Sequence, residues 1–215
     1  MRLGIFGGSF DPPHVGHLLL AQDAITALSL DCLAVVPAAT QPLKHVHRTS
    51  APRRLAMVQR CFEGVPRTVV DPVEIDRGGL SFMVDTVEHF RRRYPSALIH
   101  LLIGQDVVAT LPKWREPERL LSLVQLVIID RAAQPDDVSA CSVPSQEPGD
   151  VRPPGLASAR HLTTRRVDVS STEIRARVRD GRSIRGFVPD AVAAYIASAA
   201  LYLGEPLAGV ESERA

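Results

Sequence analysis

The chain has 215 residues, of which 45% are hydrophobic and 23% charged, a composition typical of a soluble globular protein with one domain. Its formal net charge of +1 gives no electrostatic reason to expect a nucleic acid or a membrane as a partner. Three scattered cysteines (Cys32, Cys61 and Cys141) argue against a disulfide framework or a metal site, and with the lack of a leader they indicate a cytoplasmic protein.

Short apolar runs alternate along the chain with segments of helical periodicity. Strands are predicted at Leu3–Phe6, Leu33–Val36, Thr68–Val70, Leu98–Ile103, Leu126–Ile129 and His161–Val169. Helices are predicted at 16–28, 52–62, 82–93 and 116–123, then from Ser171 and near Pro189–Ala199. Near-continuous apolar strands separated by helices favour an α/β fold with a doubly wound parallel sheet, in which ligands bind at the carboxyl ends of the strands.

The domain organisation follows from one change in composition. Residues 132–159 are rich in proline and glycine and have little periodicity, so we expect a mobile surface insertion there. Residues 1–203 then form one domain that contains this insertion, and 204–215 form a C-terminal tail.

The segment Gly7–His17, Gly-Gly-Ser-Phe-Asp-Pro-Pro-His-Val-Gly-His, lies between the first predicted strand and helix. Such a turn directs backbone N–H groups and the positive end of a helix dipole at a ligand. Gly7 and Gly8 permit a close approach to the backbone, and His14 and His17 are three residues apart, so both can face the same side. This arrangement predicts a phosphate-binding site.

A second segment, Val169–Arg175, begins another predicted helix. Ser170 and Glu173 have the spacing of a capping box, which by itself is the favoured explanation of these residues. The segment also presents three hydroxyl groups and Arg175 at a helix N-terminus, where a polyphosphate could bind. With the first motif in the same chain, we favour the phosphate site.

Several motifs together resemble a known family. Gly7–His17 resembles the signature of the HxGH nucleotidyltransferase superfamily, in the form found in bacterial nicotinate mononucleotide adenylyltransferases. Val169–Arg175 is similar to the ISSTxIR motif of that superfamily, and Ile103–Asp106 with Trp114 is similar to its GxD…W segment. Further similarities are found in Glu74–Phe82, like E-x-x-RGG-x-S-Y, and in Gln41–His45, like the PPHK loop. The resemblance implies a single-domain, Rossmann-like nucleotidyltransferase fold.

The resemblance also implies a role for each matching residue. His17 would contact the α-phosphate in the transition state, with His14 and Arg175 also acting on the phosphates. The residues implied to bind ATP are Gly7, Gly8, Ser9, Phe10, His14, His17, Gly104, Asp106, Ser170, Ser171, Thr172 and Arg175. Those implied to bind the acceptor are Lys44, Met83, Trp114 and Arg115. Trp114 follows the fourth strand in a polar, proline-flanked segment, where we expect it outside the core, and Met83 replaces a threonine of the family.

The implied reaction is the transfer of AMP from ATP to the 5′-phosphate of nicotinate mononucleotide, which gives deamido-NAD and pyrophosphate. The acceptor phosphate is largely dianionic at neutral pH and can act as the nucleophile without a protein base. Mg²⁺ would be carried on the ATP phosphates and not by a protein metal site. Two alternatives remain: a related enzyme with a phosphopantetheine or nicotinamide mononucleotide acceptor, or a non-catalytic nucleotide-binding regulator. A homo-oligomer is also possible.

Overall fold

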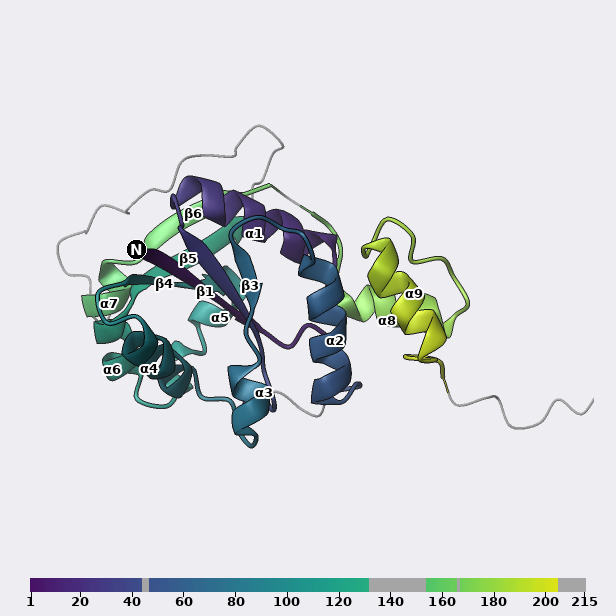
Figure 1. Cartoon of the computed structure of the whole chain (residues 1–215), viewed down its shortest axis with the longest axis horizontal. Coiled ribbons are helices and arrows are strands. Elements are labelled where there is room, and N and C mark those ends of the chain that lie inside the picture. The colour runs from purple at the N-terminus through teal and green to yellow at the C-terminus, as the bar shows by residue number, and fades with distance from the viewer. Residues whose placement is uncertain (44–46, 132–153, 166, 205–215) are drawn as a thin grey trace, which may run out of the picture.

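A six-stranded, all-parallel sheet forms the centre of the molecule, with strand order β3-β2-β1-β4-β5-β6 (Figure 1). The computed structural model describes residues 1–43, 47–131, 154–165 and 167–204. Lys44, most of the predicted insertion and nearly all of the predicted tail therefore lie outside the described residues. Strands β2 and β3 are added on one side of β1 and strands β4, β5 and β6 on the other, so the sheet is doubly wound, as the sequence predicts.

The predicted elements are present with small shifts at their ends. The strands are β1 (Arg2–Gly8), β2 (Cys32–Pro37), β3 (Thr68–Val70), β4 (Leu98–Gly104), β5 (Gln125–Arg131) and β6 (Arg160–Thr164). The longer helices are α1 (Val15–Ala27), α2 (Ala51–Phe62), α4 (Met83–Arg93), α6 (Pro117–Leu123), α8 (Ser171–Arg179) and α9 (Asp190–Ser198). The short ones are α3 (Val73–Arg77), α5 (Gln105–Val108), the 3₁₀ turn η1 (Leu111–Lys113) and α7 (Pro154–Ala157).

Two predictions about the chain after β5 need correction. Strand β6 ends at Thr164 and not at Val169, because Arg165 turns out of the sheet and pairs with Asp23 of α1 at 2.8 Å. Residues 154–159, expected in the mobile insertion, instead contain α7 and the approach to β6, and Ala157 and Ala159 are buried. The four short helical segments were not predicted because so few residues do not show a full helical period.

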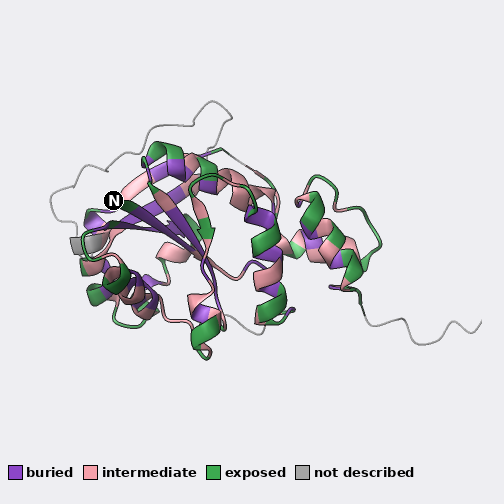
Figure 2. Cartoon of the chain, viewed as in Figure 1, coloured by how far each residue is buried: buried purple, intermediate pink, exposed green. Residues whose placement is uncertain are grey.

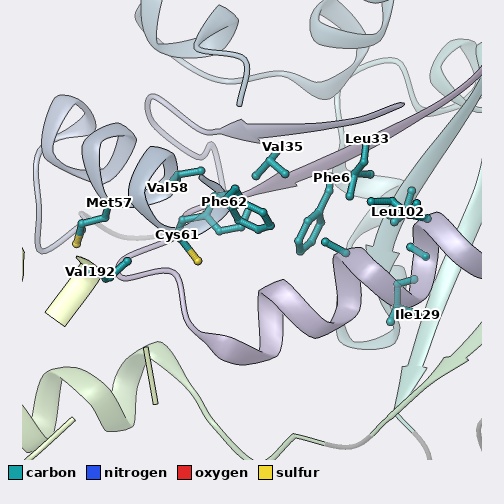
Figure 3. Packing of buried hydrophobic residues seen from close by; sticks show 14 of the residues in the cluster. Phe6, Leu33, Val35, Met57, Val58, Cys61, Phe62, Leu102, Ile129 and Val192 are labelled. Atoms are coloured by element: carbon teal, nitrogen blue, oxygen red, sulfur yellow. The ribbon is translucent and has the colours of Figure 1, made fainter. Parts of the chain in front are cut away.

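The sheet is covered on both faces, and two apolar clusters fill the space. One cluster places Phe6, Leu33 and Val35 against α1 and α2, and the C-terminal helices continue it (Figure 3). The other places Ile5 and Ile99 against α4 and α6. In Figure 2 the strands are buried along most of their length, whereas the outer surfaces of the helices are exposed. Burial on both faces explains why the strands read as continuous apolar runs.

The last two helices lie beside α2, beyond the edge of the other layers (Figure 1). The guanidinium of Arg60 on α2 stacks over the Tyr195 ring of α9, with 4.3 Å between its central carbon and the ring centroid. Val192 of α9 is buried in the same cluster as Met57 of α2. This packing holds the start of α8 near the carboxyl end of β1.

His100 in the middle of β4 is buried, and neither ring nitrogen has a hydrogen-bond partner in the part of the chain that the structure describes. Burial lowers the pKa of this imidazole to about 4, and the positive charges of Arg160 and Arg2 add to the effect. In the unfolded chain this imidazole binds a proton near pH 6.5. The stability that depends on neutral His100 is therefore fully present above that pH and is lost as the pH falls towards 4.

We therefore expect the free energy of unfolding to lose about 2 kcal/mol between pH 7 and pH 5 through this residue alone. The His100→Leu variant removes the group and should show a correspondingly smaller loss over the same interval. Urea unfolding of both proteins at the two pH values measures the difference. Parallel losses in wild type and variant would contradict the prediction.

Candidate active site

The loop that follows β1 is compact because two glycines leave room for ring side chains. A Cβ on Gly8 would lie 2.9 Å from Cζ of Phe10, and a Cβ on Gly16 would lie 3.0 Å from Nδ1 of His14. Phe10 adopts a positive φ of 49°, and its ring is buried against Phe6, so only its backbone remains to serve a ligand. The two glycines therefore let the loop pack its ring side chains closely against its own backbone.

His14 and His17 together form the start of α1. His14 is the N-cap, and its backbone N–H donates to Nδ1 of His17 at 3.1 Å. The two rings lie against each other at a tilt of 36°, with centroids 3.8 Å apart, and Phe10 contacts His17 edge-on at 5.0 Å. Because Nδ1 of His17 accepts a hydrogen bond, the proton of the neutral imidazole is on Nε2. The cap thus converts His17 into a hydrogen-bond donor with a fixed direction.

The second predicted phosphate segment lies directly against this loop. Ser171 Oγ donates to the Pro12 carbonyl at 2.8 Å, and Arg175 Nη1 donates to the Asp11 carbonyl at 2.7 Å. Arg175 Nη2 also donates to Thr172 Oγ1 at 3.2 Å. Residues about 160 positions apart in the sequence are thereby brought to one place, at the N-termini of α1 and α8.

Of the two hydrogen bonds that a capping box at Ser170 and Glu173 would contain, the structure has one. Ser170 Oγ accepts from the Glu173 N–H at 3.1 Å, which satisfies one first-turn donor of α8. The Glu173 carboxylate is paired instead with Arg177 at 3.0 Å, so the reciprocal bond of a capping box is replaced by an ion pair within the helix. Ser170 therefore serves the cap, while Ser171 and Arg175 face the loop.

The loop is also held by residues that the sequence analysis did not select. The buried Asp11 carboxylate accepts the backbone N–H of Arg48 at 2.8 Å and the hydroxyl of Tyr202 at 2.7 Å. Burial and the neighbouring Asp11 both raise the pKa of Tyr202. The Arg54 guanidinium, fully buried, donates to the carbonyls of Ser9, Ala39 and Thr49.

One of these residues carried a signal in the sequence and the other did not. Arg54 stands in the apolar stripe of α2 with Met57, Val58 and Cys61, where a charged residue breaks the helical pattern. Nothing in the local sequence around Tyr202 marks it, because its partner Asp11 is 191 residues away.

Met83, implied to bind the acceptor, lies in the first turn of α4 and reaches the end of β1. A Cβ on Gly7 would lie 2.7 Å from Met83 Cε, so the glycine makes space for this side chain. The preceding residues are fixed to the loop after β2, since Ser81 Oγ accepts the Ala39 N–H at 2.9 Å. The buried Glu74 carboxylate accepts from Thr86 Oγ1 at 2.6 Å, and burial raises its pKa.

Trp114 and Arg115 follow η1 on the same side of the sheet as α4. Trp114 is half-buried and packs against the apolar cluster under α4, which corrects the expectation that it lies outside the core. Its indole N–H donates to Thr110 Oγ1 at 3.0 Å. Arg115 lies over the Phe82 ring and is 3.5 Å from the carboxylates of both Asp85 and Glu116. Two neighbouring carboxylates thus offset its charge.

The remaining predicted residues lie at the end of β4. A Cβ on Gly104 would be 2.5 Å from Asp106 Oδ1, so the glycine admits the carboxylate at the start of α5. The ends of β1 and β4 are neighbours at the point where the strand order reverses, the usual ligand position in such sheets. Among the described residues, no three His, Cys, Asp or Glu side chains are grouped so as to hold a metal ion.

In a doubly wound parallel sheet the usual ligand position is the switch point of the strand order, which here lies beside the start of α1. The chain belongs to the cytidylyltransferase-like family, whose model matches residues 5–177. It is 62% identical to a probable nicotinate-nucleotide adenylyltransferase of Gemmatimonas aurantiaca, over 100% of this chain and 98% of the relative. A protein of the same description from Herpetosiphon aurantiacus is 37% identical, over 94% of this chain and 98% of its own length.

The fold is shared with solved structures as well. The Plasmodium falciparum nicotinic acid mononucleotide adenylyltransferase, solved in complex with NaAD, superposes with a TM-score of 0.69. The match covers 94% of this chain and 97% of that protein, at 18% identity. No helix in the described parts of the chain is long and apolar enough to cross a membrane.

Proposed function

We propose that the protein is a nicotinate-nucleotide adenylyltransferase, which transfers AMP from ATP to nicotinate mononucleotide in NAD biosynthesis. The observation that carries the proposal is the junction of α1 and α8. There His17, with its proton on Nε2, and the hydroxyl and guanidinium groups of Ser171 and Arg175 surround one loop. The full-length 62% identity to a relative of that description supports the same activity.

In the proposed reaction, an oxygen of the acceptor's 5′-phosphate attacks the α-phosphorus of ATP. The bond from that phosphorus to the bridging oxygen breaks, and pyrophosphate leaves with the electron pair. His17 donates from Nε2 to an α-phosphate oxygen, and His14 lies beside it between the α- and β-phosphates. Arg175, Ser171 and Thr172 stabilise the departing pyrophosphate, while the backbone at Gly7, Gly8, Ser9 and Phe10 contacts the nucleotide. The protein contributes alignment and charge stabilisation without a covalent intermediate.

The adenosine and acceptor sides complete the proposal. Gly104 and Asp106 lie along the adenosine ribose, while Ser170 caps α8 beneath the phosphates. Met83, Trp114 and Arg115 receive the nicotinate ring, and Lys44, which lies outside the described residues, contacts the acceptor phosphate. Mg²⁺ enters with ATP, coordinated by phosphate oxygens and water, and reduces the negative charge of the triphosphate. We propose that the reaction takes place in the cytoplasm.

The decisive experiment is an assay of the purified protein with ATP, Mg²⁺ and a panel of phosphate acceptors, following pyrophosphate release. We expect release with nicotinate mononucleotide well above that with nicotinamide mononucleotide or phosphopantetheine. Release only with phosphopantetheine would reassign the enzyme within the superfamily. ATP binding without release for any acceptor would support a non-catalytic regulator.

Arg175→Ala should lower kcat/KM for ATP by about 10- to 100-fold, because it removes charge-assisted hydrogen bonds to the leaving group. Helix α8 should stay folded, since the Ser170 cap does not involve this side chain. Steady-state kinetics and thermal unfolding measure the two effects separately. Arg177→Ala, on the same helix but paired with Glu173, is the matched control and should retain wild-type kinetics. A large drop in Tm with unchanged kinetics for Arg175→Ala would leave it only a structural role.

A further inference from the structure

Arg54 is the one residue in the apolar stripe of α2 that carries a charge. Its side chain is completely buried, with 0% of its surface exposed. The guanidinium donates to three backbone carbonyls, those of Ser9 at 2.9 Å, Ala39 at 2.7 Å and Thr49 at 3.2 Å. These carbonyls belong to the loop after β1, the start of the loop after β2 and the approach to α2.

The Ala39 peptide continues this connection towards the acceptor side. While its carbonyl accepts from Arg54, its N–H donates to Ser81 Oγ at 2.9 Å, and the Ser81 N–H donates to the Thr40 carbonyl at 2.8 Å. Ser81 stands two residues before Met83, where α4 begins. A continuous series of hydrogen bonds therefore runs from Ser9, beside the phosphate loop, through Arg54 and Ala39 to the start of α4.

Stability alone is a poor explanation for this arginine. A buried guanidinium must be removed from water, which is unfavourable even when its hydrogen bonds are satisfied, and an apolar residue would suit the stripe. Burial lowers the pKa of the Arg54 guanidinium, and the negative charge of the nearby Asp11 carboxylate raises it again in part. What arginine offers and an apolar residue does not is a planar fork that fixes several acceptors in one geometry.

We propose that Arg54 is a positioning residue for the transfer reaction. It fixes the loop at Ser9, on the ATP side, relative to the start of α4, on the acceptor side. The inference rests on the proposed function, because it concerns the alignment of two bound substrates. In-line displacement requires the reacting oxygen and phosphorus to be roughly 3–3.5 Å apart and aligned, and a misplacement of about 1 Å can reduce the rate 100-fold. Arg54 contacts neither substrate and acts through the two loops.

The test compares Arg54→Lys with Arg91→Lys. Lysine retains the charge but replaces the fork with a single ammonium group, which cannot reach all three carbonyls in the same geometry. Arg91 is the matched control, since it also joins two backbone carbonyls, those of Ala97 and Leu123, each at 2.6 Å. Those residues precede β4 and β5, at the opposite ends of the strands from the candidate site.

We expect Arg54→Lys to lower kcat by about 10- to 100-fold per folded molecule, with the KM values for ATP and acceptor changing much less. Arg91→Lys should lower Tm but keep wild-type kcat. Ser81→Ala interrupts only the acceptor side and should reduce kcat/KM for nicotinate mononucleotide while leaving the KM for ATP unchanged.

Wild-type kinetics in folded Arg54→Lys would overturn the inference. If that variant does not fold, Ser81→Ala decides: wild-type acceptor kinetics would overturn it, and a selective acceptor defect would support it. The wild-type rate in the same assay tests the proposed function, whereas the ratio of variant to wild type tests Arg54. Failure of one is therefore distinguishable from failure of the other.

Discussion

Replacing His17 with alanine is expected to lower kcat by about 10²–10³-fold while changing the KM for ATP by only a few-fold. The reason is the direction of its proton. Nδ1 is occupied by the backbone N–H of His14, so Nε2–H is held as a donor before the substrate arrives. A preorganised donor is most effective where negative charge increases, which in the proposed reaction is the α-phosphate in the transition state. Steady-state kinetics with ATP and nicotinate mononucleotide measure both constants.

The His17→Asn variant separates this role from the cap. The asparagine Oδ1 can take the position of Nδ1 and accept the His14 N–H, but no atom reaches the position of Nε2. We expect His17→Asn to recover much of the thermal stability lost in His17→Ala and little of the lost rate. Recovery of the rate together with the stability would show that His17 matters only as a cap of α1.

The fold, and the two segments that begin α1 and α8, could be predicted because their signals are local. A strand run, a Gly-Gly turn and two histidines lie within Gly7–His17, and the hydroxyls with Arg175 lie within one helical turn. Their convergence follows from parallel topology, since both segments begin helices after strands of one sheet. The hydrogen bonds from Ser171 and Arg175 to residues 11 and 12 agree with that expectation.

The supporting residues could not be predicted for the opposite reason. The Asp11–Tyr202 hydrogen bond joins residues 191 positions apart, and only the packing of α9 on α2 brings them together. The partial burial of Trp114 depends on the apolar cluster under α4, which no local pattern reveals. Arg54 is an intermediate case: its place in the apolar stripe of α2 is a signal in the sequence, but its three carbonyl partners come from separate loops and have no such signal.

The enzyme is also expected to prefer nicotinate mononucleotide to its amide by a factor on the order of 10² or more in kcat/KM. The substrate carboxylate presents two acceptor oxygens, and the first turn of α4 at Met83 offers N–H groups that have no partner within the helix. The NH₂ group of an amide would face one of these N–H donors and leave that donor without an acceptor. Binding sites with polar groups discriminate strongly against a ligand that leaves one of those groups unpaired. Met83 provides no hydroxyl where the resembling family has threonine, so the backbone must supply the contact.

Arg115 decides how much of this preference comes from charge. Its guanidinium is 3.5 Å from both Asp85 and Glu116, so its attraction for a carboxylate is largely offset, and donor geometry should dominate. Arg115→Gln should then reduce the acid-to-amide ratio by less than about tenfold, the equivalent of roughly 1.4 kcal/mol. The ratio is measured at saturating ATP for the wild type, Arg115→Gln and Met83→Thr, and the last should raise it by restoring a hydroxyl donor. A wild-type ratio near one, or in favour of the amide, would show that Met83 marks a change of acceptor specificity.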